Sequence, residues 1–406
     1  MSDLLDGVFR SLRFFNYRVW AAGAIVSNIG TWMQRTAQDW LVLTGLTHHS
    51  ASAVSIVMSL QFGPQLLLMP VSGFAADHFD RRKLLMLTQA VQGALALGLG
   101  VLTVAGLVQL WHVYLFAFVF GCATAIDAPV RQTFVSELVG DAELPNAVAL
   151  NSTSFNLARM VGPAVAGLVI ASVDTGWAFV LNGLSFAAVL ISLCYIRTDQ
   201  LRAGPRAARA PGGVAAGFRY VWGRPDLRAT LIMLFLIGTF GLNFPIFIST
   251  MAVSVFHADA SRYGALSSMM ALGTVTGALS SARVNRPRFA SMLMASVVFG
   301  IGCTVAALAP NYWTFGGSLV VIGIASLMFL TTTNSLMQLS TEPVMRGRVM
   351  AIRFAVVLGG TPLGAPIVGW VADHFGPRWS IMVGAASGFA AAWVAARALA
   401  RQRDLE

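Results

Sequence analysis

Three ionisable residues stand inside long apolar stretches of the sequence, where a charge needs a partner or a cavity. Arg35 and Asp39 are four residues apart in the stretch 17–46, so a helix places them on the same face. Arg159 lies near the middle of a second stretch, 147–172. A charged side chain at the centre of a membrane helix costs roughly 2.5–3.5 kcal/mol and usually faces a cavity or a partner. These positions therefore predict a charged site inside a membrane.

Two interpretations of these charges remain open. If Arg35 and Asp39 face a cavity, protonation of Asp39 releases Arg35 and changes the charge of the site, which is a proton-coupling step. The alternative is a fixed ion pair near the outer interface. Arg159 can likewise belong to the functional site or bond helix ends and carbonyl groups as a structural residue.

Uncharged polar side chains in the apolar stretches predict the lining of a cavity. The candidates are Asn28, Gln38, Gln61, Gln65, Asn156, Asn243 and Asn334. The 17 Met and 26 Phe residues add adaptable apolar surface, although most of them pack or face lipid. This mixture suits a small amphiphilic ligand better than a sugar, which needs more hydrogen-bonding groups on each helix.

A short charged segment, 73–83, connects two apolar stretches, 50–72 and 84–106. Each stretch is long enough to cross a bilayer as a helix, which takes roughly 20 apolar residues. The three adjacent cations at 81–83 place the connector on the cytoplasmic face. The simplest interpretation of this segment is that it lies in water and only fixes the orientation of the neighbouring helices in the membrane.

The spacing within the connector suggests a gating contact as well. The residues predicted to take part are Gly73, Asp77, Arg81, Asp127 and Arg131. Gly73 allows a close approach between helices. Asp77 can lie at the positive N-terminus of the eleventh predicted helix. Arg81 can pair with Asp127, which lies near the inner end of the fourth.

Gly162, Pro163 and Gly167 stand in the middle of the predicted fifth helix. Small residues allow tight packing, here expected against a helix of the other half of the chain, and proline bends the helix. Alternatively, these three residues only allow helices to pack and have no role in function.

Composition sets the class of protein. The chain has 406 residues, of which 56% are hydrophobic and 11% charged, and its mean hydropathy is +0.71. Soluble domains carry about 25% charged residues, so the sequence predicts an all-α integral membrane protein. The net charge of +10 reflects topology, because nearly all basic residues fall on segments predicted to be cytoplasmic, including both termini. Nucleic acid is therefore not an expected partner.

The cysteines and the N-terminal segment argue against three further features: a disulfide framework, a metal site and a removable signal peptide. Cys122, Cys194 and Cys303 lie in apolar stretches and show no disulfide framework or metal spacing, so no metal or cofactor is expected. The N-terminal segment does not resemble a removable signal peptide.

The apolar stretches predict twelve transmembrane helices in two pseudo-symmetric six-helix bundles. The predicted parts are a cytoplasmic interfacial helix at 1–16, an N-terminal bundle at 17–196, a cytoplasmic linker with an interfacial helix at 197–226, a C-terminal bundle at 227–400 and a cytoplasmic tail at 401–406.

Internal repeats support two related halves. Ile29-Gly30-Thr31-Trp32 matches Ile237-Gly238-Thr239-Phe240, and Gly162, Gly167 and Trp177 match Gly364, Gly369 and Trp379. Parallel repeats of this kind are typical of some transporters. The pattern Gly-x-x-Ala-Asp-His-Phe also occurs twice, from Gly73 and from Gly369, the second time on the expected outer side. This second repeat can be explained either by nested inverted repeats or by coincidence.

The segment 73–83 resembles the loop signature of the major facilitator superfamily, although Asp80 stands where that family more often has Gly. The resemblance covers residues 14 to about 400 and implies that the loop contacts hold the two halves in an outward-facing state. The glycines around Pro163 resemble, in part, the antiporter signature of drug exporters. Residues 30–35, Gly-Thr-Trp-Met-Gln-Arg, are similar to the branch that holds enterobactin-type siderophore exporters and macrolide-type efflux pumps.

The resemblance implies a secondary active transporter in the bacterial cytoplasmic membrane. It would export a small amphiphilic molecule (a drug, a siderophore or a similar metabolite) by alternating access and proton antiport. The implied partners are the substrate, protons and membrane lipid, and a monomer is expected. An importer or facilitator of the same fold is the nearest alternative. An intramembrane enzyme has little support, because the sequence has neither His-Glu-x-x-His nor Gly-x-Ser-x-Gly.

Overall fold

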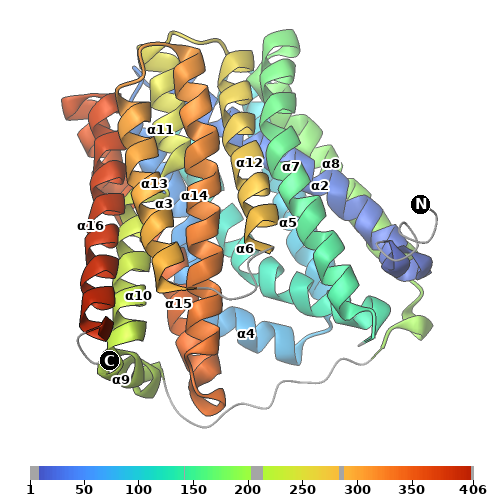
Figure 1. The fold of residues 1–406 in the computed structure, drawn as a ribbon. Helices are drawn as coiled ribbons and strands as arrows, with labels where there is room; N and C mark the ends of the chain where they lie inside the picture. The colour runs from blue at the N-terminus through green and yellow to red at the C-terminus, as the bar shows by residue number, and fades with distance from the viewer. Residues whose placement is uncertain (1–8, 141, 203–213, 283–287, 404–406) are drawn as a thin grey trace. The chain divides into compact units, whose positions relative to one another are not determined.

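The computed structural model describes residues 9–140, 142–202, 214–282 and 288–403, apart from the side chains of residues 76, 77, 214, 282 and 401–403. Every regular element in these ranges is a helix (Figure 1). The prediction of an all-α membrane fold is confirmed. The interfacial helix predicted at 1–16 lies partly outside the described residues, and so does the linker predicted at 197–226. From residue 9 onward the chain forms a 3-10 turn, Arg10–Arg13, before the first long helix.

The chain divides into two compact units. The first comprises residues 1–46 and 63–209, and the second comprises residues 47–62 and 210–406. The helices of the first unit are η1 (Arg10–Arg13), α2 (Phe15–Trp40), η2 (Leu41–Leu46), α4 (Met69–His78), α5 (Arg81–Val104), α6 (Leu110–Val139), α7 (Leu144–Val173), α8 (Thr175–Tyr195) and η3 (Thr198–Gln200). One helix, α3 (Ala51–Leu67), begins in the second unit and ends in the first.

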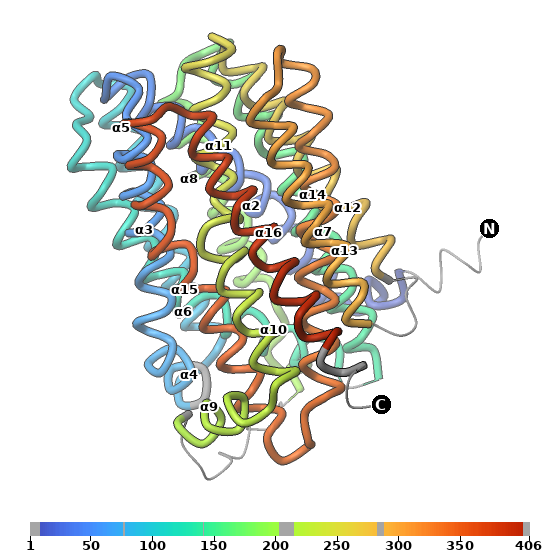
Figure 2. The backbone as a smooth tube through the Cα atoms, turned by 60° about the vertical axis from the view of Figure 1, so that its left-hand side comes forward, coloured from blue at the N-terminus to red at the C-terminus, as the bar shows by residue number. Residues whose placement is uncertain are grey.

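The second unit is built from the later helices. They are α9 (Val214–Gly223), α10 (Pro225–Leu236), η4 (Ile237–Gly241), α11 (Phe244–Thr250), η5 (Met251–Val255), α12 (Ala260–Ala282), α13 (Phe289–Ala307), α14 (Tyr312–Leu339), α15 (Pro343–Phe375) and α16 (Pro377–Arg403). In this unit α12 packs along α14, α13 packs along α14 and α16, and α10 runs beside α16 (Figure 2).

Among the described residues, nine helical segments are long and apolar enough to cross a membrane, or ten if the bent pair α3 and α4 is one span. The long helices α2 and α12 are not among them. In α2 the charges of Arg18, Arg35 and Asp39 lower the hydropathy. The count of twelve spans therefore stays a prediction.

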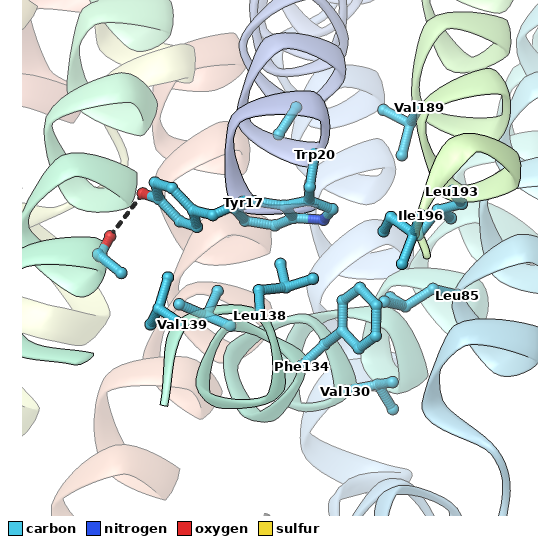
Figure 3. Packing of buried hydrophobic residues seen from close by; sticks show 13 residues of the cluster. Tyr17, Trp20, Leu85, Val130, Phe134, Leu138, Val139, Val189, Leu193 and Ile196 are labelled. Atoms are coloured by element: carbon cyan, nitrogen blue, oxygen red, sulfur yellow. Dashed lines mark hydrogen bonds between the residues drawn. The ribbon is translucent and has the colours of Figure 1, made fainter. Parts of the chain in front are cut away.

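The first unit is held at one end by a buried aromatic cluster. Tyr17 and Trp20 of α2 pack with Phe134 and Leu138 of α6, and all four side chains are at most 4% exposed (Figure 3). The Tyr17 hydroxyl donates a hydrogen bond to the carbonyl of Ala147 in α7 at 2.9 Å. Because a close-packed core resists displacement, this cluster fixes α2, α6 and α7 relative to one another.

Matching glycines make matching contacts in the two units. A Cβ added to Gly162 of α7 would lie 2.5 Å from Trp32 Cβ in α2. A Cβ added to Gly364 of α15 would overlap the carbonyl oxygen of Thr239 in η4, and Thr239 corresponds to Thr31 in the sequence repeat. The glycines that repeat in the sequence therefore make the same kind of helix–helix contact in both units. The expectation that Gly162 packs against the other half was wrong, because its neighbour is α2 of the same unit.

The chain bends by 56° between α3 and α4. The break falls at Leu68, two residues before Pro70. Proline has no amide N–H to donate to the carbonyl four residues earlier, and its ring clashes with that carbonyl. The bend therefore has a local cause in the sequence.

Candidate functional site

The first unit contains a cavity of about 830 Å³ between α2, α5, α6, α7 and α8. Small-molecule pockets usually measure roughly 300–1,000 Å³. The predicted residues Asn28, Arg35, Asp127 and Arg131 all line it. Its other lining residues are Thr31, Gln92, Phe120, Thr124, Ala128, Gln132, Thr133, Val135, Ser136, Leu144, Val148, Asn151, Ser152, Phe155 and Phe186.

Asp127 is the centre of a buried polar cluster beside this cavity. Its Oδ1 accepts hydrogen bonds from Thr88 Oγ1 at 2.8 Å and from Gln89 Nε2 at 2.7 Å. Its Oδ2 accepts from Nε and Nη2 of Arg131, one helical turn further along α6, at 3.1 and 3.0 Å. Each carboxylate oxygen therefore has two donors, which compensates the cost of burying the charge.

Arg81 pairs with Glu137 and not with Asp127, so the predicted pairing was wrong. Arg81 Nη1 donates to Glu137 Oε1 at 2.6 Å, and the two side chains are 10% and 18% exposed. Glu137 lies near the end of α6, whereas Asp127 lies almost three turns deeper and is occupied by its three neighbours. The gating role suggested for Arg81 stays a prediction.

Removing either partner of the Arg81–Glu137 pair is expected to lower the free energy of unfolding by about 1–3 kcal/mol, because the other charge stays largely buried. Arg81→Gln, Glu137→Gln and the double variant, unfolded by denaturant in detergent, form a double-mutant cycle. The double variant should cost less than the sum of the singles. The matched control is Arg10–Glu143, which is close at 2.7 Å but more exposed, 46% and 25%, and should cost no more than about 1 kcal/mol. Equal costs for the two pairs would contradict the prediction.

Two other residues of the 73–83 segment stabilise helix ends. Asp80 caps α5, because its side chain accepts a hydrogen bond from the Lys83 amide at 2.9 Å. Arg82 Nε donates to the carbonyl of Leu193 in the last turn of α8 at 2.7 Å. A Cβ at Gly73 would have no neighbour within 4 Å, so the close approach expected there is not seen among the described residues. The side chain of Asp77 lies outside the described residues.

The Trp32 ring of α2 lies close to two guanidinium groups. The Arg35 and Arg159 Cζ atoms stand 4.8 and 5.4 Å from the centre of its ring. Phe155 meets the ring edge-on at 5.6 Å. Asp39 and Arg159 are both close enough to Arg35 to interact with it electrostatically. The structure therefore brings together the three ionisable residues predicted from the sequence, around an indole ring that attracts cations to its face.

The other predicted cavity residues do not join Asn28 on this cavity. Three belong to the first unit: Gln38, Gln65 and Asn156. Three belong to the second: Gln61, Asn243 and Asn334. Asn243 is fully buried and donates to the Thr239 carbonyl at 2.7 Å. Pro163 and Gly167 are buried in α7. The predicted lining is thus divided between the two units.

The second occurrence of the Gly-x-x-Ala-Asp-His-Phe pattern makes a defined contact. Asp373 of α15 caps the start of α3: its Oδ1 accepts from the Ala51 amide at 2.6 Å and its Oδ2 from the Ser52 amide at 2.9 Å. A Cβ at Gly369 would lie 2.6 Å from Ser55 Oγ, so this glycine permits the close approach. The aspartate of the pattern here stabilises a helix N-terminus.

Several residues of the site were missed at the level of sequence. Thr88, Gln89 and Gln92 of α5 lie beside Asp127 or on the cavity, and Trp32 lies at the centre of the charged group. The two glutamines stand three apart in an apolar helix, which places them on one face. This spacing could have identified the two glutamines from the sequence.

Comparison with known proteins gives a family match over nearly the whole chain. Residues 7–405 match the family described as transmembrane secretion effector. The multidrug efflux pump Tap of Mycolicibacterium fortuitum is 27% identical over 87% of this chain and 88% of its own length. The staphyloferrin A transporter of Staphylococcus aureus is 26% identical over 86% of this chain and 87% of its own. The enterobactin exporter EntS of Shigella flexneri is 25% identical over 84% and 81%.

Solved structures show the same fold at low identity. A POT family transporter in complex with a thioalcohol-conjugated peptide superposes with a TM-score of 0.77 at 11% identity, covering 96% of both chains. A bacterial homologue of the iron transporter ferroportin gives a TM-score of 0.72 at 12% identity, covering 94% of this chain and 98% of its own. The helical arrangement within the chain is therefore that of a transporter fold.

Proposed function

Because the chain belongs to the transmembrane secretion effector family of major facilitator transporters, we propose that it exports small amphiphilic molecules in exchange for protons. Transport of small molecules out of the cell follows from the family and its relatives, which include an efflux pump and a siderophore exporter. The exchange for protons, the bacterial cytoplasmic membrane as location, and cytoplasmic termini are the parts that we propose. A single chain in lipid is the proposed working unit.

The observation that carries the proton exchange is the position of Asp39. It lies on α2 next to Arg35, which lines the cavity, and Arg159 approaches the same tryptophan ring from α7. With Asp39 ionised, the group holds two cations and one anion. Protonation removes the anion and leaves two guanidinium groups that repel each other. Proton binding would therefore favour a rearrangement of α2 against α7.

Asp127 is an acid that lines the cavity, and its surroundings make it the weaker candidate. Both of its oxygens are occupied by donors, and its charge is balanced by Arg131. A proton can bind there only by displacing one of these hydrogen bonds. Asp39 interacts electrostatically with Arg35, which Arg159 also approaches, so its charge acts directly on a pair of cations.

Asp39→Asn is expected to reduce proton-driven transport by about tenfold or more, which corresponds to 1.4 kcal/mol. The assay follows radiolabelled naphthalene-2-sulfonate and ethidium into inside-out vesicles whose interior is made acidic. Uptake in this orientation corresponds to export from the cell, and an uncoupler should abolish it. Exposed Asp199, in η3, provides the matched control Asp199→Asn, which should behave like the wild type.

Two results would contradict the proposal. Full proton-driven uptake in Asp39→Asn would show that another group carries the proton. Accumulation only in right-side-out vesicles would show an importer of the same fold.

A further inference from the structure

Three arginine side chains gather where α2 begins and α8 ends, two helices that pack along each other. The Cζ atoms of Arg18 and Arg197 lie 6.0 and 4.3 Å from the centre of the Phe15 ring. The Cζ atom of Arg202 lies 5.7 Å from the centre of the neighbouring Phe14 ring. These distances are those of cation–π contacts. Two adjacent rings thus hold three cations at one end of the first unit, and we call these cations the arginine cluster.

The arginine cluster has an excess of positive charge. All three residues are exposed, and none of them forms an ion pair within the part of the chain that the structure describes. Glu143 and Glu137, at the neighbouring ends of α7 and α6, pair with Arg10 and Arg81 instead. Asp199 is exposed in η3 and offsets one of the three cations at most. The cluster therefore attracts an anion and leaves room for it to approach.

Arg18 also lines a groove of about 420 Å³ between η1, α2 and α7. It is the one charged residue among the described residues that line this groove, and most of the others are apolar. The apolar lining is open to contact: Phe9 is 45% exposed, Leu157 is 41% exposed, and Ala22 is exposed as well. The groove thus offers accessible apolar surface next to a cation.

Hydrogen bonds hold one wall of the groove in place. The amide and the hydroxyl of Ser11 in η1 donate to Asn146 Oδ1 in α7 at 3.0 and 2.7 Å. The ion pair Arg10–Glu143, at 2.7 Å, connects the same two elements. Leu12, which lines the groove from η1, is therefore fixed against the start of α7. The groove is a built feature of the fold.

The position of the two features in the membrane suggests what occupies them. The helices α7 and α8 are long and apolar enough to span a membrane, so their ends lie near its surface. Arg18 lies in the first turn of α2, and Arg197 lies just beyond the end of α8. Basic pockets between membrane helices bind the head groups of anionic lipids. A free phosphate would gain nothing from the apolar groove, and a lipid without net charge would gain little from the cations.

We propose that the arginine cluster and the groove together bind one anionic phospholipid. Its head group lies beside Arg18, one acyl chain lies in the groove, and the other two arginines attract the head group electrostatically. The lipid would contact α2 and α7, the two helices that carry Arg35 and Arg159. This site goes beyond the proposed export function and does not depend on it.

The experiment compares two photoreactive lipids that differ only in the head group. Phosphatidylglycerol and phosphatidylcholine carry the same diazirine in one acyl chain, and each is added to the full-length protein in nanodiscs of unlabelled phosphatidylcholine. After irradiation, mass spectrometry measures the label on peptides that contain residues 9–25 and 150–157. The label from phosphatidylglycerol should exceed that from phosphatidylcholine at least about tenfold, because each uncompensated cation favours an anionic lipid about fivefold.

Variants test which residues produce this ratio. Arg18→Gln should lower it about fivefold, whereas Arg18→Lys keeps the charge and should retain most of it. Ala22→Phe fills the groove, so it should reduce the label from both lipids in these peptides. The matched control is Arg219→Gln: Arg219 is an exposed arginine of α9 that does not line the groove, so the ratio should stay that of the wild type.

A ratio near one in the wild type would overturn the proposal and indicate that only bulk lipid fills the groove. An unchanged ratio in Arg18→Gln would overturn it as well. Displacement of the phosphatidylglycerol label by inorganic phosphate, beyond that caused by sodium chloride at the same ionic strength, would show a site for free phosphate and would also refute the lipid site. None of these outcomes bears on the export proposal, because labelling is measured without a proton gradient.

Discussion

Asp127→Ala is expected to lower the free energy of unfolding by about 3–5 kcal/mol, the usual cost of removing one partner of a buried ion pair. The substitution leaves the Arg131 cation without its counter-ion. It also deprives the buried Gln89 amide of its acceptor and removes one of the two acceptors of the Thr88 hydroxyl, which keeps the Leu85 carbonyl. This loss of stability arises mainly because buried polar groups remain unpaired, and less because the hydrogen bonds to Asp127 are lost.

The measurement is denaturant unfolding of the purified protein in detergent, followed by tryptophan fluorescence. Replacing both partners with apolar residues, as Asp127→Leu with Arg131→Met, should recover part of the loss, because no unpaired charge remains. Asp226→Ala is the control: its pair with Arg224 at 2.8 Å is partly exposed, 40% and 23%, and should contribute no more than about 1 kcal/mol. If Asp127→Ala costs as little as Asp226→Ala, the buried cluster does not stabilise the first unit.

Gly162→Val is expected to abolish transport and to lower the stability of the first unit by about 1–3 kcal/mol or more, the range for overpacked cores. A Cβ at this position would lie 2.5 Å from Trp32 Cβ and 3.0 Å from the Met33 amide nitrogen. The backbone of α2 cannot move aside without carrying Trp32 and Arg35 with it. The charged group around Trp32 would therefore be displaced together with the helix.

The same substitution at an open position provides the control. Gly317 lies within α14, and a Cβ there would meet nothing within 4 Å. Gly317→Val should thus change the stability only slightly, with helix propensity favouring the variant, and leave vesicle transport intact. Gly364→Val, at the corresponding contact of the second unit, should behave like Gly162→Val. Normal transport by Gly162→Val would contradict the close packing of α7 on α2.

The fold could be predicted from the sequence because apolar length and sparse charge leave few alternatives. Long apolar stretches with short polar connectors can only be membrane helices, and the repeated glycines correctly indicated related halves. Element ends were less predictable. The first long helix begins at Phe15 and passes into a π-helical turn at Leu41–Leu46, a local change of hydrogen bonding that side-chain periodicity does not reveal.

The site was only partly predictable, because a pattern shows which residues share a helix face but not which helix faces which. Arg35, Asp39 and Arg159 were identified by the cost of burying a charge, and the structure brings them together around Trp32. The partner of Arg81 was misassigned because the choice between Asp127 and Glu137 depends on the depth of α6 beside α5. Gln89 and Gln92 were missed although they stand three apart on one face of α5, because the pattern does not show which helix that face meets.

The division of α3 between the two units has a mechanical consequence. Asp373 and Gly369 fasten its first turns to α15, yet the helix continues past Gly63 into the other unit. The first turns of α3 therefore belong to one unit and its last turns to the other. Its weakest point is at Gly63-Pro64, where the glycine has open space around it and the proline donates no hydrogen bond. The sequence thus places the least constrained point of α3 at the residue where one unit gives way to the other.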